Sequence, residues 1–180
     1  MLSLYWKVYH PIKVAISNFF ITDKHVVDKE LSLTSYEWME VIAYIAKCEG
    51  VYLNHTQHHK ILYICYMILL CAKNTAICEK PVAFPFGPVF KKSHQRIINP
   101  QSITAETYEN IKSIHPEILQ IFELTVRRVC HSQAVKLVNW ACRDTSAWHI
   151  HSKIHKYPWG TKMTNYDILN EGLDYLITQE

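Results

Sequence analysis

The sequence predicts a mainly α-helical, compact domain with one short extended element around residues 81–89, and three observations predict it. Hydrophobic residues make up 49% of the 180 residues and charged residues 19%, which is enough apolar surface to bury a core. Glycine is scarce, with 4 in the chain, as expected of helices joined by short connections. After residue 33, apolar residues recur at helical spacing. We therefore predict an N-terminal extension over residues 1–33 and one helical domain over residues 34–180.

The first helix of this domain is predicted to begin after Thr34. Thr34 and Glu37 have the spacing of a capping box, in which the hydroxyl accepts from the third helical amide and the carboxylate reaches back. Gly50 is predicted to end this helix, because glycine tolerates the left-handed conformation found past helix ends. In the extension before it, we expect a helix from Pro11 to Phe20.

A second helix is predicted from Thr56 to Lys73, and it is apolar on nearly every side after Lys60. Such a helix must be surrounded by other elements, so we place it at the centre of the fold. Its apolar run stops after Ala72, short of the roughly 20 residues that a membrane span needs. The same run is also compatible with a homodimer interface.

The stretch from Pro81 to Val89 cannot be helical, because it holds three prolines and a glycine. It is predicted to form a short strand or an ordered extended loop. Helices are then expected from Ala105 to Ile114 and from Pro116 to Cys130, followed by one capped by Ser132 that reaches Ala141. A last helix from Asn165 to Thr178 has capping spacing between Thr164 and Asp167, and its predicted inner side carries Leu169, Gly172, Leu173 and Leu176.

Six cysteines without a CxxC pair favour a reducing compartment over a disulfide framework. The N-terminus lacks the continuous apolar segment of a secretory signal. We therefore expect a soluble cytoplasmic protein with no membrane partner. The net charge is only +3, so nucleic acid is not an expected partner either.

Several motifs, taken in order, resemble the Panacea-domain family, also called phage-associated proteins. Val41–Ile45 is similar to the family's VAxYI helix, Lys60–Tyr63 to its KLxKLLYY helix, and Ala83–Val89 to its AWxYGPV turn. Ala147-Trp148 stands where the family has its Pro-Trp motif. The family's Thr-His pair is replaced here by Ala141-Cys142. The resemblance covers about residues 38–178 and none of the first 33.

The resemblance implies a non-enzymatic antitoxin that binds and silences a cognate protein toxin encoded beside it, without a cofactor. Some relatives deliver the toxin to a protease, so a proteolytic adaptor is an alternative. Within the motifs, an internal contact of Lys60 with the carbonyls of the 81–89 segment is favoured over direct partner binding, and Gly87 is expected to make a sharp turn. The candidate motif and partner-binding residues are Lys60, Leu62, Tyr63, Ala83, Phe86, Gly87, Pro88, Val89 and Trp148.

Two other functions stay open from the residues alone. A metal-dependent hydrolase would use His151 and His155, which are spaced four apart, with the cluster His55, His58 and His59. The glutamate that zinc hydrolases carry after the first histidine is absent, because Ser152 stands there, and we expect no bound metal. A DNA-binding autoregulator would use Lys91, Lys92 and Arg96 as phosphate contacts.

Overall fold

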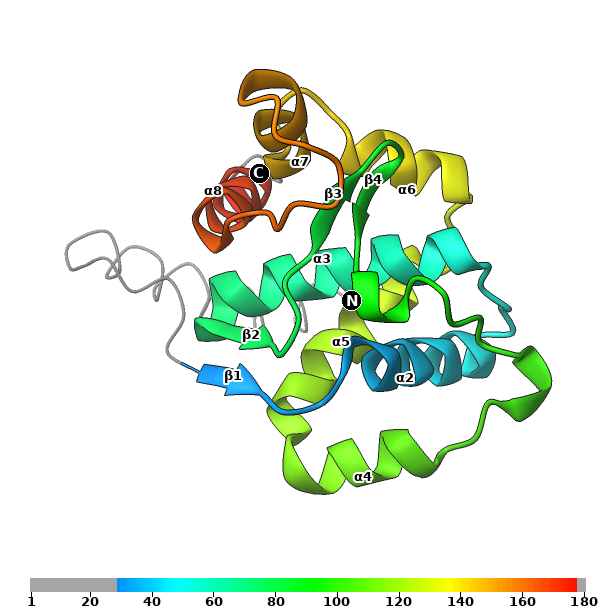
Figure 1. Cartoon of the computed structure of the whole chain (residues 1–180). Coiled ribbons are helices and arrows are strands. Elements are labelled where there is room, and N and C mark those ends of the chain that lie inside the picture. Colours follow the sequence, from blue (N-terminus) through cyan, green and yellow to red (C-terminus); the bar gives the residue numbers. More distant parts are fainter. Residues whose placement is uncertain (1–28, 178–180) are drawn as a thin grey trace.

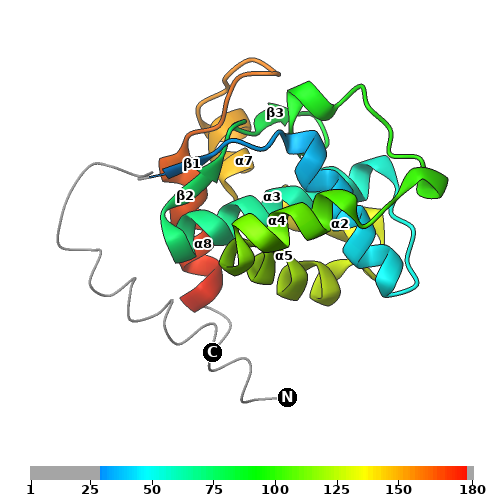
Figure 2. The ribbon, with the colours of Figure 1, turned by 90° about the horizontal axis from the view of Figure 1, so that it is seen from below.

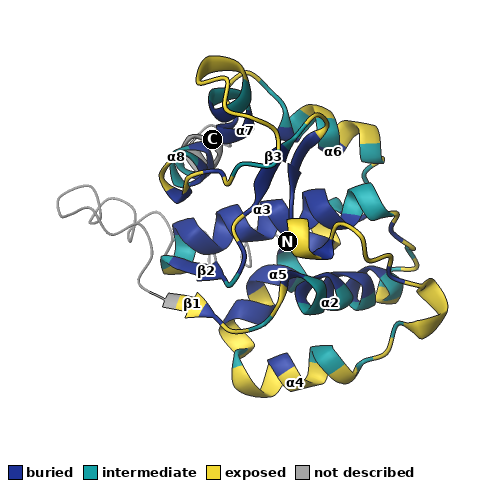
Figure 3. Ribbon diagram, in the orientation of Figure 1, coloured by how far each residue is buried: buried dark blue, intermediate teal, exposed yellow. Residues whose placement is uncertain are grey.

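Helix α3 (His55–Lys73) runs through the centre of the computed structural model, which describes residues 29–177 (Figure 1). It packs against α2 (Ser35–Cys48), α5 (Pro116–Val129), α6 (Ala134–Ala141) and α8 (Asn165–Ile177). Every residue from His58 to Cys71 is buried, and α3 is almost uniformly dark in Figure 3. The prediction of a mainly helical fold is confirmed, and α3, predicted to be apolar on nearly every side after Lys60, lies at its centre.

The ends of α2 and α3 are set by side chains close in sequence. Thr34 caps α2 in a complete capping box with Glu37, as predicted, and Gly50 follows the helix with φ +75°. Helix α3 begins one residue earlier than predicted, because Asn54 caps it through a second capping box with Gln57. The Asn-x-x-Gln spacing was therefore a readable signal for this helix start.

The later helices follow the predicted order, with α4 (Glu106–Ile114) crossing beneath α2 and α5 in the view of Figure 1. Helix α6 begins after Gln133 without a side-chain cap, so the predicted cap by Ser132 is wrong. Thr164 accepts from the Asp167 amide at 3.1 Å before α8, as its spacing indicated. The short α7 (Ala147–His149) and the π-helical η3 (Ile150–Ile154) were not predicted.

The predicted extended element is a β-hairpin. Strands β3 (Val82–Phe84) and β4 (Gly87–Val89) pair antiparallel, with Val82 opposite Val89. The free side of β3 is covered by the chain before α8: the Ala83 amide donates to the Thr161 carbonyl at 3.1 Å, and the Gly160 amide donates to the Ala83 carbonyl at 2.8 Å. Strand β3 is thus hydrogen-bonded along both edges, in the upper half of the molecule in Figure 1.

A second, parallel pair of strands was not predicted. Strand β1 (Lys29–Leu31) pairs with β2 (Thr75–Ile77), which directly follows α3 (Figure 2). Strand β1 lies inside the stretch assigned to the N-terminal extension, and Leu31 is buried in the core. The helix predicted from Pro11 to Phe20 lies outside the described residues.

Helix α8 crosses α3 closely at Gly172. A Cβ at Gly172 would collide with the Cys71 thiol and lie 2.9 Å from Met67 Cγ. On the predicted inner side of α8, Gly172 is buried, whereas Leu169 and Leu173 are only partly buried. All six cysteines of the chain are free thiols. None of the helices in the described part is long and apolar enough to cross a membrane.

Candidate functional site

The motif residues meet where α3 passes the hairpin. Lys60 is 2% exposed, and its Nζ donates to the Pro88 carbonyl at 2.8 Å. This is the internal contact that the sequence favoured over partner binding. Burial lowers the pKa of Lys60 to about 8, and the neighbouring Cys142 opposes this shift. The ammonium therefore ties the second turn of α3 to β4.

Gly87 makes room for that ammonium. Its φ is +101°, a conformation that L side chains rarely adopt, and an added Cβ would lie 3.0 Å from Lys60 Cε and 3.2 Å from Cys142 Sγ. The sharp turn inferred from the Gly-Pro pair is therefore required both by the backbone and by the close approach of Lys60.

We expect Gly87→Ala to destabilise the protein by roughly 2–6 kcal/mol, because a strained φ and a tight contact each cost about 1–3 kcal/mol. Gly160→Ala is a matched control, since Gly160 has φ +85° but nothing within 4 Å of an added Cβ. The Gly160→Ala variant therefore measures the cost of a positive φ without the cost of a close contact. Urea unfolding measures both, and equal losses in the two variants would contradict the role assigned to Lys60 packing.

Trp148 joins the hairpin to the chain after α7. Its indole Nε1 donates to the Phe84 carbonyl at 2.8 Å, and its ring stacks with that of Trp159 at 6.1 Å. Lys153 Nζ lies 5.6 Å from the Trp148 ring centroid and 6.0 Å from that of Trp159. Trp148, which stands where the family has its Pro-Trp motif, thus anchors the hairpin.

Tyr63 leads to a buried polar network at α8. Its hydroxyl donates to Glu171 Oε2 at 2.5 Å, and the same oxygen accepts from the Ala147 amide at 3.0 Å. Glu171 Oε1 lies 2.8 Å from Arg143 Nη1, an ion pair without hydrogen-bond geometry. Burial raises the pKa of Glu171, while Tyr63 and Arg143 oppose the shift. This network fixes α7 and α8 against α3.

Burial separates the predicted residues into two groups. Phe86 is 76% exposed at the tip of the hairpin. The other eight are buried, namely Lys60, Leu62, Tyr63, Ala83, Gly87, Pro88, Val89 and Trp148. Among the predicted residues, Phe86 is thus the one whose side chain is exposed. Trp159, which the sequence analysis did not single out, joins the site through its stack on Trp148.

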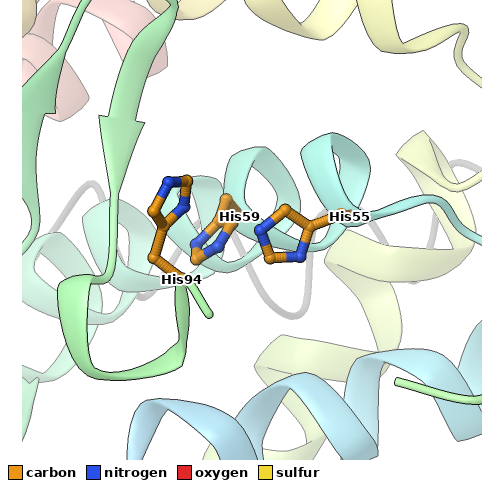
Figure 4. A group of neighbouring side chains, drawn as sticks. All are labelled: His55, His59 and His94. Carbon is orange, nitrogen blue, oxygen red and sulfur yellow. The ribbon is translucent and has the colours of Figure 1, made fainter. Parts of the chain in front are cut away.

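The histidines form one group that spans distant parts of the chain (Figure 4). His55 and His59 at the start of α3 meet His94, which follows η1 (Lys91–Ser93), and one ring nitrogen from each lies within 4.8 Å of the others. Burial lowers the pKa of His59 to about 2, with further lowering by His55 and Lys60. His58, expected in this cluster, is not part of the group.

His151 and His155 do not join such a group among the described residues. His151 is buried with Nε2 at 2.7 Å from Thr161 Oγ1, and the exposed His155 stacks with Tyr157. The three basic residues considered for DNA contacts are exposed around η1, namely Lys91, Lys92 and Arg96.

No protein-family model, curated protein sequence or solved structure matches the chain significantly.

Proposed function

We propose that the protein is a cytoplasmic antitoxin-type binding protein that neutralises a toxin encoded beside it by covering a surface of that toxin. The order of the Panacea-like motifs supports this proposal. The observation that carries it is a set of exposed apolar side chains on the hairpin and on the segment that runs into the residues bonded to β3.

We call this the hairpin-end surface and define it by four exposed side chains. Phe86 is 76% exposed at the hairpin tip, Ile154 is 64% exposed in η3, and Tyr157 and Trp159 are each 49% exposed in the segment that follows. This segment continues into the residues that hydrogen-bond to Ala83 of β3. Exposed apolar surfaces with a polar rim are typical of protein-binding sites.

The segment that carries three of these side chains is basic. Lys153, Lys156 and Lys162 are exposed, and the stretch 153–162 contains no acidic residue. The hairpin-end surface therefore fits a partner face that combines apolar and acidic residues, because opposite charges speed and orient association. Aromatic side chains such as Phe86 and Trp159 are the kind that anchor interfaces.

Co-expression with the product of the adjacent gene tests the proposal. We expect the wild type to restore growth and to co-purify with that product, and Phe86→Ser combined with Trp159→Ser to lose both effects. The matched control is Ile114→Ser, because Ile114 is 60% exposed but lies at the end of α4, away from the hairpin (Figure 1). All variants are first checked for wild-type stability.

Undiminished toxicity with the wild type would refute the antitoxin proposal. If the Ile114 variant and the Phe86/Trp159 double variant have equal effects on growth and co-purification, the hairpin-end surface is not the interface. A proteolytic adaptor would form the same complex but would shorten the lifetime of the toxin in cells, which a translation-arrest chase measures.

A further inference from the structure

Three histidines from two separate segments come together beside the hairpin (Figure 4). His55 and His59 lie four residues apart in the first two turns of α3, so they share a face. The ring centroids of His55 and His59 are 4.7 Å apart, and that of His94 lies 5.4 Å and 5.6 Å from theirs.

The backbone on both sides of this group is held in place. Asn54 and Gln57 cap the start of α3 reciprocally. On the other side, the buried Ser93 hydroxyl bonds to that of Ser35 in α2, and the Lys92 amide donates to Glu79 Oε1 at 2.7 Å. His94 therefore follows an anchored turn, and its approach to α3 is a property of the fold.

The distances between the ring nitrogens need to shorten only a little for all three to coordinate one ion. Tetrahedral zinc with Zn–N bonds of about 2.0–2.1 Å places its nitrogen ligands about 3.4 Å apart, against the 4.8 Å limit here. His94 is exposed and His55 partly buried, so both side chains have space to move. His59 is buried, and its Nε2 has no hydrogen-bond partner.

One contact opposes metal binding and lowers the affinity of the site for the ion. The Phe90 amide donates to His59 Nδ1 at 3.2 Å, which leaves the proton of the neutral ring on Nε2. Metal-bound histidines commonly donate through their second nitrogen instead. A metal that binds Nε2 must therefore displace its proton, and a metal that binds Nδ1 can do so only after the ring has rotated away from the Phe90 amide. Either change costs free energy, so the affinity is lower than that of structural zinc sites.

We propose that His55, His59 and His94 form a binding site for a zinc-class divalent transition metal, with water completing the coordination. Three imidazoles suit zinc, nickel and copper rather than magnesium or calcium, which prefer oxygen ligands. The group contains no carboxylate to act as a general base. The ion therefore links the start of α3 to the segment after β4, and this property is independent of the proposed antitoxin function.

Zinc titration of the full chain, purified with a chelator and then dialysed, tests this site by calorimetry and thermal unfolding. We expect about one zinc per chain and a Tm raised by roughly 5 °C or more at zinc about 100-fold above Kd. Cobalt substitution should give the visible absorption of a four-coordinate site. Magnesium should leave Tm unchanged.

Variants assign the ion to these residues. His94→Ala, at an exposed position, should weaken zinc binding by on the order of tenfold or more, and His55→Ala should do the same. His131→Ala removes an exposed histidine outside the group and should leave binding unchanged. Absence of saturable zinc binding overturns the proposal. So does binding that His55→Ala and His94→Ala leave at wild-type strength.

Discussion

Replacing Glu171 by alanine is expected to destabilise the protein by about 3–5 kcal/mol. The substitution leaves the Tyr63 hydroxyl and the Ala147 amide buried without an acceptor, and it removes the ion-pair partner of Arg143. Unsatisfied buried donors each cost about 1–3 kcal/mol. Because the network joins α3, α7 and α8, its loss should loosen the hairpin end of the molecule as well.

Urea unfolding measures this loss, with two variants for comparison. Glu171→Gln keeps the shape and one acceptor oxygen, so it should lose less than Glu171→Ala. Glu109→Ala removes an exposed carboxylate that lies 3.8 Å from Lys112, and it should change stability by no more than about 0.5 kcal/mol. A loss below about 1 kcal/mol in Glu171→Ala would show that water replaces the carboxylate.

We also expect the metal-free protein to lose stability as the pH falls below about 6.5, because of its buried histidines. His58 is 4% exposed, and burial lowers its pKa to about 4. The unfolded chain takes up this proton near pH 6.5 and the folded chain only near pH 4, so acid favours unfolding between these values. The shift corresponds to roughly 3 kcal/mol once the pH is below both values. Burial also lowers the pKa of His59, to about 2, so this side chain adds to the loss of stability in acid.

Urea unfolding between about pH 7 and pH 5, with a chelator present, tests this dependence. His58→Gln cannot titrate and should show a smaller loss of stability on acidification than the wild type. Ile61→Val, at a fully buried position of the same helix, should lower stability by about 0.5–1.5 kcal/mol at every pH without changing the slope. A pH slope that His58→Gln leaves unchanged would contradict the assignment.

Local signals in the sequence were sufficient to predict most of the helices. The capping box of Thr34 and Glu37 and the spacing of Thr164 and Asp167 join residues three apart, and both form in the structure. The continuous apolar run of α3 predicted its central place, and the prolines before Val89 predicted an extended element. Caps and periodicity are interactions within one turn, so they can be read without knowledge of the fold.

The candidate sites depended on contacts between distant residues. The pairing of β1 with β2 joins three-residue strands, which are too short to show a period, across the whole of α2 and α3. His94 approaches His55 and His59 from a turn that is bonded to α2 and to Glu79, both distant from it in sequence. The exposure of Phe86 and the burial of the other motif residues likewise depend on contacts between distant parts of the chain. Interactions between neighbouring residues were enough to predict most of the helices, whereas the short strands and the choice of which side chains meet or stay exposed depend on tertiary packing.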